Sequence, residues 1–336
     1  MSPQTIPDTL HALLEHLIDY AGLFPPAQLP FEAALKQYVA YQHHADCWML
    51  GPFICPTRKL DTLVAQQSDW QEVSPFRVAL LPPPLTTPKT AVQEFRQSLS
   101  EAQTLLAPLE NALTPQWIEI KFPDALLQQI SVSSRLEFLT ECAGILQETL
   151  PSCKTIFWEI RRQGPWYRTL DQFMEAAALY QETRKAETPT TSFKIRCGGL
   201  SPADFPTSEE VATAIVLGRE AAVCFKATAG LHQPFRYFDG EMGVFRHGFI
   251  NLFTAAILSN TYRLSIQEVI PVLEDNDPEH FSFEQNRLHW EHLHAPKKQV
   301  VYTRKELAHS FGSCSFDEPR EALRTYGLLP PEKAVA

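Results

Sequence analysis

Glycine is scarce in this sequence, and the glycine spacings of the common nucleotide-binding loops are missing. The chain has only 13 glycines among its 336 residues. Neither a GxGxxG nor a GxxxxGK[ST] segment occurs. In those loops the backbone N–H groups hold the phosphates of dinucleotides and nucleoside triphosphates. Nucleotide binding by these two routes is therefore excluded.

Cysteine spacing also excludes some classes of protein. The seven cysteines are odd in number, and no two of them have the CxxC spacing. Such scattered cysteines are typical of reduced, buried thiols in a cytoplasmic protein, not of a disulfide framework or a zinc ribbon. We expect a cytoplasmic protein with no metal and no other cofactor.

Positive charge and long apolar runs are lacking as well. The formal net charge is −10, whereas non-specific nucleic-acid binding needs a basic face. No apolar run reaches the roughly 18 residues of a membrane-spanning helix. The N-terminal segment MSPQTIPDTL lacks the charged and apolar regions of a signal peptide. Neither nucleic acid nor a membrane is expected as a partner.

Two kinds of segment alternate along the chain. Short apolar or β-branched runs that end near proline or glycine predict strands, and longer runs with apolar residues three or four apart predict helices. The predicted strands are 20–25, 47–55, 76–81, 116–122, 155–161, 193–197, 223–228 and 311–316. The predicted helices are 31–44, 57–67, 88–106, 134–149, 168–186, 207–219, 246–260 and 318–327, with another at 8–18.

This alternation predicts an α/β fold, a (β/α)8 TIM barrel over residues 1–336 with an N-terminal helix. A doubly wound open sheet is disfavoured because it has fewer repeats and a glycine-rich first turn. Residues 262–300 interrupt the rhythm before the eighth strand, with a helix at 265–273 and a hairpin in HFSFEQNRLHWEH. This inserted segment is either peripheral, such as a homo-oligomer surface, or a lid over the site.

Pairs of charged or polar residues two apart recur in the fourth to seventh predicted strands. Because side chains alternate between the lumen and the helix layer, each pair shares one face of its strand. The pairs are Glu119 with Lys121, Glu159 with Arg161, Lys194 with Arg196, and Lys226 with Thr228. Apolar residues of opposite parity, such as Ile118 and Ile195, are expected to face the helices. The charges therefore predict an ionic layer in the lumen. At the first strand, Asp19 could face either the lumen or the surface.

Lys194 and Lys226 stand near the ends of neighbouring strands, in FKIRCGG and FKATAGLH. A lysine acts as a nucleophile only when its amine is neutral, and burial or a nearby cation lowers its pKa. The pattern resembles the deoxyribose-phosphate aldolase family of class I aldolases, which carry lysines on the sixth and seventh barrel strands. The resemblance implies that Lys194 forms a Schiff base and that Lys226 lowers its pKa. Glu119 or Glu159 would move protons.

The sequence departs from that family in two places. Ile195, Arg196 and Cys197 follow the first lysine, where the family has small hydroxylated residues. The segment 262–300 has no counterpart in the family.

Without the resemblance, the same region predicts an anion site. Arginine offers a planar fork for carboxylate or phosphate, and glycines allow backbone N–H groups to approach the anion. His232 is a candidate acid or base, a member of a metal site with Glu241 and His247, or a solvated loop residue. The candidate substrate-binding residues are Lys121, Arg161, Arg196, Gly198, Gly199, Thr228, Gly230, Arg236, His247 and Asn251.

These residues predict a lyase that acts on a small anionic carbonyl metabolite through a Schiff base on Lys194. Lys226, Glu119, Glu159 and His232 complete the candidate catalytic set. One alternative is a metal-assisted hydrolase or isomerase that uses Glu119, Glu159 and His232. Another is a non-catalytic barrel that binds an anionic metabolite.

Overall fold

Eight parallel strands close into a barrel in the computed structural model, which describes residues 6–129, 131–162, 164 and 166–332. The last strand pairs with the first, in the order β1-β13-β7-β6-β5-β4-β3-β2. The strands are β1 (Ile18–Tyr20), β2 (Leu50–Pro56), β3 (Phe76–Leu81), β4 (Leu113–Lys121), β5 (Thr155–Glu159), β6 (Thr190–Arg196), β7 (Phe225–Thr228) and β13 (Ala308–Ser313). The predicted TIM barrel is confirmed.

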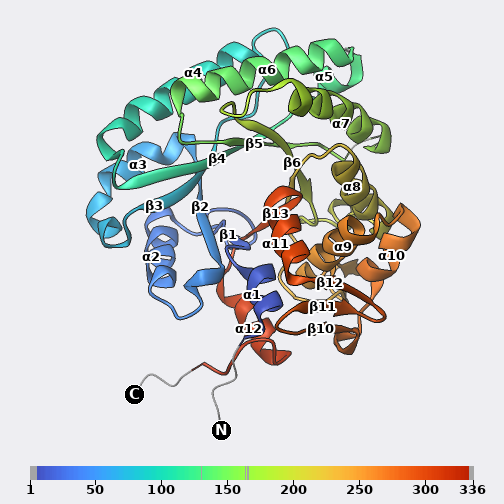
Figure 1. Ribbon diagram of the computed structural model, residues 1–336. Coiled ribbons are helices and arrows are strands. Elements are labelled where there is room, and N and C mark those ends of the chain that lie inside the picture. Colours follow the sequence, from blue (N-terminus) through green and yellow to red (C-terminus); the bar gives the residue numbers. More distant parts are fainter. Residues whose placement is uncertain (1–5, 130, 163, 165, 333–336) are drawn as a thin grey trace.

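Helices surround the barrel on its outside (Figure 1). Those that follow barrel strands are α2 (Phe31–Gln42), α3 (Leu60–Ala65), α4 (Ala91–Leu106), α5 (Asp124–Gln129), α6 (Val132–Thr149), α7 (Trp166–Thr183), α8 (Ser208–Glu220), α9 (Phe249–Tyr262) and α12 (Asp317–Thr325). The predicted N-terminal helix is α1 (Asp8–Leu14). No membrane-crossing helix is found in the described part of the chain, since none of its helices combines enough length with enough apolar character.

Two apolar cores lie on the two faces of the barrel wall. The larger one fills the space between strands and helices, and it includes Ile118, Trp158 and Ile195. The smaller one consists of Ile54, Ala79, Trp117 and Phe157. Trp117 lies on the same face of β4 as Glu119, and Phe157 lies on the same face of β5 as Glu159, so this core faces the lumen. The predicted assignment of apolar residues to the helix side is confirmed. Polar side chains of the other parity are therefore left for the lumen.

The segment before the last strand differs from its prediction. It holds α10 (Ile266–Glu274), a three-stranded antiparallel sheet and α11 (Lys297–Glu306). The sheet adds a third strand to the predicted hairpin, and its strands are β10 (Phe281–Phe283), β11 (Arg287–Trp290) and β12 (Leu293–Pro296). A further hairpin of β8 (Tyr237–Asp239) and β9 (Val244–Arg246) follows β7, where a loop was predicted.

The first and last barrel strands begin earlier than predicted. β1 overlaps the predicted 20–25 only at Tyr20, because Ile18 pairs with both Leu50 and Phe311. β13 begins at Ala308 instead of residue 311, since Ala308 pairs with Phe225 of β7. Polar residues at these strand starts conceal the strands from a search for apolar runs. The third strand, in contrast, has the predicted bounds.

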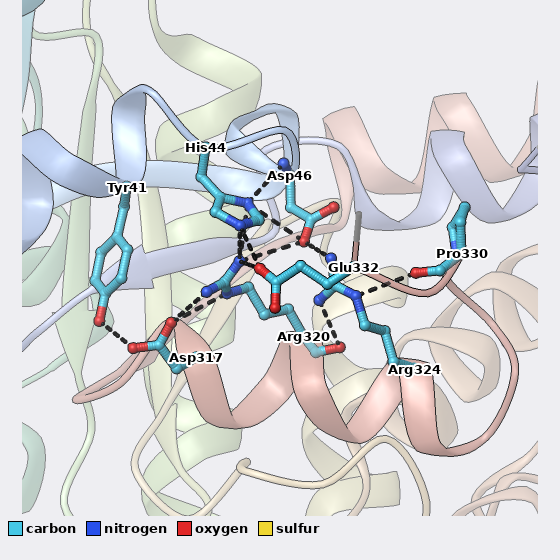
Figure 2. Close-up of polar contacts among 8 residues, drawn as sticks. All are labelled: Tyr41, His44, Asp46, Asp317, Arg320, Arg324, Pro330 and Glu332. Atoms are coloured by element: carbon cyan, nitrogen blue, oxygen red, sulfur yellow. Dashed lines mark hydrogen bonds and ion pairs between the residues drawn. The ribbon is translucent and has the colours of Figure 1, made fainter. Parts of the chain in front are cut away.

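A polar network joins α2 and α12, which come from opposite ends of the chain (Figure 2). Asp317 Oδ2 accepts a hydrogen bond of 2.7 Å from the Tyr41 hydroxyl, and Asp317 Oδ1 lies 2.5 Å from Arg320 Nη2. Arg320 and Arg324 also contact the Asp46 carboxylate beyond α2. α2 follows β1 and α12 follows β13, and these two strands pair with each other where the barrel closes. The network therefore joins the two helices that follow the closing pair of strands.

Candidate active site

Ionic side chains from neighbouring strands meet in the lumen near the carboxyl ends of the strands. The ladder places Glu159 of β5 beside Lys194 of β6, and Lys194 beside Lys226 of β7. Glu119 reaches the same layer from β4, and its carboxylate contacts both lysines. The structure thus brings together four of the five predicted catalytic residues.

These groups form a continuous chain in which anions and cations alternate. Its members, in order of contact, are Asp19, Lys226, Glu119, Lys194 and Glu159. We call it the ion-pair chain. Lys226 Nζ lies 2.7 Å from Asp19 Oδ2 and also contacts Glu119 Oε1. Lys194 Nζ lies 3.2 Å from Glu119 Oε2 and 2.8 Å from Glu159 Oε2. Three carboxylates thus share two ammonium groups.

Asp19 is the functional candidate that the sequence left undecided. It is fully buried in the lumen, and its Oδ2 accepts a 2.6 Å hydrogen bond from the Ser310 hydroxyl. Its Oδ1 is buried without a hydrogen-bond partner among the described residues. A Cβ atom on Gly51 would lie 2.1 Å from that oxygen, so glycine is required on the neighbouring strand. The glycine in the predicted second strand was a signal for this position.

Below the ion-pair chain lies an aromatic layer that includes a histidine. Lys226 Nζ is 5.0 Å from the centroid of the Trp117 ring and 5.8 Å from that of Phe157. The His309 ring lies against both aromatic rings, with centroids 4.9 and 5.6 Å away. Burial and then the charge of Arg304 lower the pKa of His309 to about 3, which keeps the ring neutral. His309 was not predicted because it precedes the predicted eighth strand.

The ion pairs keep the carboxylates next to the lysines ionised. Burial alone would raise the pKa of Glu119, but Lys226 and Lys194 outweigh it and lower the pKa to about 2. Lys194 likewise outweighs burial at Glu159 and lowers its pKa. Asp19 differs, because burial dominates there and raises the pKa to about 6. Asp19 is therefore the carboxyl of the ion-pair chain whose pKa burial brings nearest to neutrality.

The predicted lowering of the Lys194 pKa by Lys226 is wrong. Burial does act in that direction, but the Glu159 and Glu119 carboxylates outweigh it, and the pKa of Lys194 lies above its ordinary value. Glu119 lies between the two lysines and contacts both ammonium groups. A carboxylate in that position replaces repulsion between the two cations with attraction.

The ion-pair chain opens at one end into a pocket of about 570 Å³, which we call the central pocket. Glu119, Glu159 and Lys194 line this pocket, whereas Asp19 and Lys226 lie beneath the surface. Its walls come from the ends of several strands and the loops after them, and they include Phe24, Pro25, Leu200, Thr228, Met242, Arg246 and Cys314. A lysine between two carboxylates at the base of such a pocket can exchange protons with a small ligand.

Glycines bring two loops of the central pocket into contact. A Cβ atom on Gly198 would lie 2.8 Å from the Gly230 Cα, and one on Gly230 would lie 2.6 Å from the Cys197 carbonyl oxygen. Gly230 also has a φ of +74°, a conformation that favours glycine. Gly199 and Gly230 line the pocket with Thr228, and the approach of their backbone to a ligand stays a prediction. Gly198 holds the two loops together.

His232 lies at the edge of the central pocket, where its Nδ1 is 2.6 Å from Glu318 Oε2. The structure does not bring it together with Glu241 and His247 as metal ligands. Among the residues that the structure describes, the one group of three side chains spaced to share a metal ion is Asp275, His280 and Glu291, in the inserted segment. The predicted alternative of a metal site at His232 therefore has no geometric support.

Four predicted substrate-binding residues, Gly198, Arg236, His247 and Asn251, line neither the central pocket nor the second pocket that adjoins it. The Asn251 amide donates to the carbonyls of Val272 and Asp275 and accepts from the backbone N–H of Arg236. The Arg236 guanidinium stacks 3.7 Å from the Phe245 ring centroid. His247 is buried, with Nε2 2.9 Å from the Pro206 carbonyl oxygen. These contacts hold the segment after β7 in place.

Lys121 and Arg161 face a second pocket, next to the central one. This outer pocket has a volume of about 380 Å³ and is lined by both residues together with Arg162 and Arg196. Lys121 Nζ lies 3.8 Å from Asp124 Oδ2, and Arg161 Nη1 lies 3.3 Å from the same oxygen. Arg196 lines both pockets. Of the predicted substrate-binding cations, Lys121 and Arg161 thus line the outer pocket, Arg196 lines both pockets, and Arg236 lines neither.

Comparison with known proteins assigns no family to the chain. It matches no model of a known protein family, and no curated protein matches it. The fold is one that many enzymes share. The function has to be argued from the ion-pair chain and the two pockets.

Proposed function

We propose that this protein is a lyase that forms an imine between Lys194 and a small carbonyl compound carrying an anionic group. One observation carries the proposal. The Lys194 ammonium lies at the base of the central pocket, between the carboxylates of Glu119 and Glu159. An amine, two proton-accepting groups and space for a small ligand are the parts that imine chemistry needs.

The two carboxylates supply the proton transfers of this reaction. Lys194 must first give a proton to Glu159 or Glu119, and its neutral amine then adds to the carbonyl carbon. Proton return to the carbinolamine oxygen expels water and leaves a cationic iminium. That cation draws in the electron pair of the bond between the α and β carbons of the substrate while a carboxylate takes the proton of a hydroxyl group on the β carbon, so the β fragment leaves as an aldehyde or ketone and an enamine remains on Lys194. The carboxylate then returns the proton to the α carbon, which restores the iminium, and water adds to it and releases the second product and the free amine. The protons thus stay within Lys194, the two carboxylates and the substrate.

The raised pKa of Lys194 is compatible with this mechanism. The carboxylates that favour the ammonium also favour the iminium, because both place one positive charge at Nζ. They slow the first attack, since less neutral amine is present, and they stabilise the electrophile on which bond cleavage depends. The role of Lys226 then differs from the one implied by the resemblance. It keeps Glu119 ionised, while Glu119 separates it from Lys194.

The anionic group of the substrate is assigned to the late loops of the barrel. Arg196 lies at the end of β6 with a side chain that is 52% exposed, so its donors are free to turn toward a ligand. Gly199 and Gly230 line the same wall of the central pocket. Late barrel loops of this kind often bind phosphate. The partner that follows is a small anionic metabolite.

Reductive trapping tests the proposal directly. The protein is incubated with a panel of small anionic aldehydes and ketones, reduced with borohydride, and mapped by mass spectrometry. We expect a covalent adduct on Lys194, its loss in Lys194→Met, and its retention in a control variant at the exposed Lys154, Lys154→Met. If no member of the panel modifies Lys194, the imine mechanism is wrong.

A second candidate, a non-catalytic barrel that binds an anionic metabolite, is favoured by the raised pKa of Lys194 alone. A permanently cationic lysine binds an anion and does not attack a carbonyl. In that case an anionic carbonyl compound would raise the unfolding temperature of the protein without forming a trapped adduct. The two readouts from one sample separate the two functions.

A further inference from the structure

We propose that the outer pocket binds a second anionic group, so that the substrate of the proposed lyase is a carbonyl compound with two anionic groups. The identity of the carbonyl compound rests on the proposed function, whereas anion binding in the outer pocket does not. The second group is a phosphate or a carboxylate, the two anions that arginine and lysine recognise.

Four cationic side chains line this pocket although the protein is acidic overall. Lys121 ends β4, Arg161 and Arg162 follow β5, and Arg196 ends β6. They come from the carboxyl ends of three neighbouring strands, which meet at one edge of the barrel. Four carboxylates, those of Asp124, Glu159, Asp204 and Glu210, lie among these cations, so anion binding depends on which cationic donors they leave unsatisfied.

The carboxylates of Asp124 and Glu159 each contact two cationic side chains, which leaves some N–H donors of the pocket cations free for a ligand. Asp124 Oδ2 serves both Lys121, at 3.8 Å, and Arg161, at 3.3 Å. Glu159 serves Arg196 at 3.6 Å while it binds Lys194 at 2.8 Å. Charge-assisted hydrogen bonds usually measure about 2.7–2.9 Å. The longer contacts therefore indicate cations that are held near a carboxylate but not saturated by it.

The remaining groups of the outer pocket leave room for an anion. The Asp204 carboxylate also lines it, but its Oδ2 already accepts hydrogen bonds of 2.8 and 3.0 Å from the backbone N–H and hydroxyl of Ser201. Arg162 contacts the Ala203 carbonyl oxygen and lies 3.4 Å from Glu210, so it is partly committed. Lys121, Arg161 and Arg196 are the donors available to a ligand.

The outer and central pockets adjoin, so one molecule can occupy both. Glu159, Arg196 and Asp204 line both of them. A substrate whose carbonyl carbon lies at Lys194 can therefore extend past Arg196 and place its far end beside Arg161 and Lys121. The combined space suits a metabolite with its reactive carbon near one anionic group and a second anionic group at the other end.

Inorganic phosphate is the first probe, measured by isothermal titration calorimetry. Loss of a hydrogen bond to a charged group costs affinity of about tenfold. We expect Arg161→Gln to bind phosphate about tenfold more weakly than the unchanged protein, with Arg161→Lys in between. Arg168→Gln removes an exposed arginine seven positions away that lines neither pocket, and should bind normally. Circular dichroism checks that the variants fold.

The outcomes separate this inference from the proposed function. If phosphate does not bind, or binds equally to Arg161→Gln and the unchanged protein, the outer pocket is not an anion site, whatever the trapping experiment gives. If phosphate binding depends on Arg161 while Lys194 forms no adduct, the anion site stands and the lyase falls. If both succeed, a carbonyl compound with two anionic groups should be trapped faster than its singly charged analogue. Arg161→Gln should remove that preference, and its persistence would overturn the assignment of the substrate class.

Discussion

Removal of the central carboxylate is the sharpest test of the ion-pair chain. Glu119 is buried, and its two oxygens contact Lys226, Lys194 and the Trp117 indole N–H. Glu119→Gln keeps the size of the side chain and one oxygen, but it removes the charge and turns an N–H donor toward an ammonium group. Two buried lysines would then depend on Asp19 and Glu159 alone.

The expected loss of stability follows from burial and from the pKa. Removal of one partner from a buried ion pair costs about 3–5 kcal/mol. The pKa of Glu119 gives a similar figure, because a fall from 4.5 to about 2 corresponds to about 3 kcal/mol at about 1.36 kcal/mol per pKa unit. Since native domains are stable by about 5–15 kcal/mol, the variant should still fold.

The pH dependence has a defined sign. A carboxyl whose pKa is lower in the folded state contributes stability that is present above its unfolded pKa and is lost as pH falls through its folded pKa. For Glu119 this window runs from 4.5 down to about 2. The stability difference between the unchanged protein and Glu119→Gln should therefore be complete at neutral pH and about 2 kcal/mol smaller at pH about 3.

Urea unfolding followed by circular dichroism measures these differences. Glu148→Gln is the matched control, because Glu148 forms a 2.8 Å ion pair with Arg96 while both side chains are at least half exposed. Such a surface pair contributes about 0–1 kcal/mol. If Glu119→Gln lost no more stability than this control at neutral pH, or if its deficit did not shrink in acid, the reasoning about the ion-pair chain would be refuted.

Three further substitutions test other parts of the structure. When the protein is labelled with ¹³C at its aspartate carboxyl groups, one carboxyl resonance should titrate near pH 6 in NMR spectra. That resonance should be missing from the spectra of Asp19→Asn. Because that pKa lies above the unfolded value of 3.8, its contribution to stability is present below 3.8 and lost as pH rises through about 6. Gly230→Ala should lower the free energy of urea unfolding by about 1–3 kcal/mol, whereas Gly240→Ala, where a Cβ meets open space, should not. Arg320→Met leaves Asp46 with fewer partners and should lower the free energy of unfolding by about 1–3 kcal/mol, which is seen as a lower unfolding temperature. An unchanged unfolding temperature would show that the network in Figure 2 adds nothing to stability.

Much of the barrel was predictable because its strands obey one simple rule. Parallel strands buried on both faces are apolar runs, and charges inside them can only face the lumen. That rule placed Glu119, Glu159, Lys194 and Lys226 on the correct side of the wall, and it gave β3 its observed bounds.

The rule fails where a strand is short or polar. β1 has three residues, one of them Asp19, and β13 opens with Ala308, His309 and Ser310. No apolar run marks the start of either strand. Where each strand begins is set by its pairing with neighbouring strands, and that pairing joins parts of the chain that are distant in sequence. Asp19, which the sequence left undecided, and Ser310, which it missed, lie in these two strands and touch each other.

Strand positions alone leave the sign of the Lys194 pKa shift open, because they place an anion, Glu159, on one side of it and a cation, Lys226, on the other. Adjacent strands place Lys194 beside Lys226, which by itself predicts repulsion between them. The largest opposing effect comes from Glu159 on the other neighbouring strand, whose carboxylate lies 2.8 Å from Lys194 Nζ and raises the pKa. Glu119, which stands two strands from Lys194 on β4, adds to this effect by reaching across the lumen to both lysines. A pKa depends on the arrangement of side chains in space, and a closed barrel brings together strands that are not neighbours. The same closure links Asp19, whose pKa of about 6 makes it the most readily protonated carboxylate of the three, to Lys194 through Lys226 and Glu119. A change in charge at Lys194, such as the loss of its proton to Glu159, therefore alters the electrostatic field along the whole ion-pair chain.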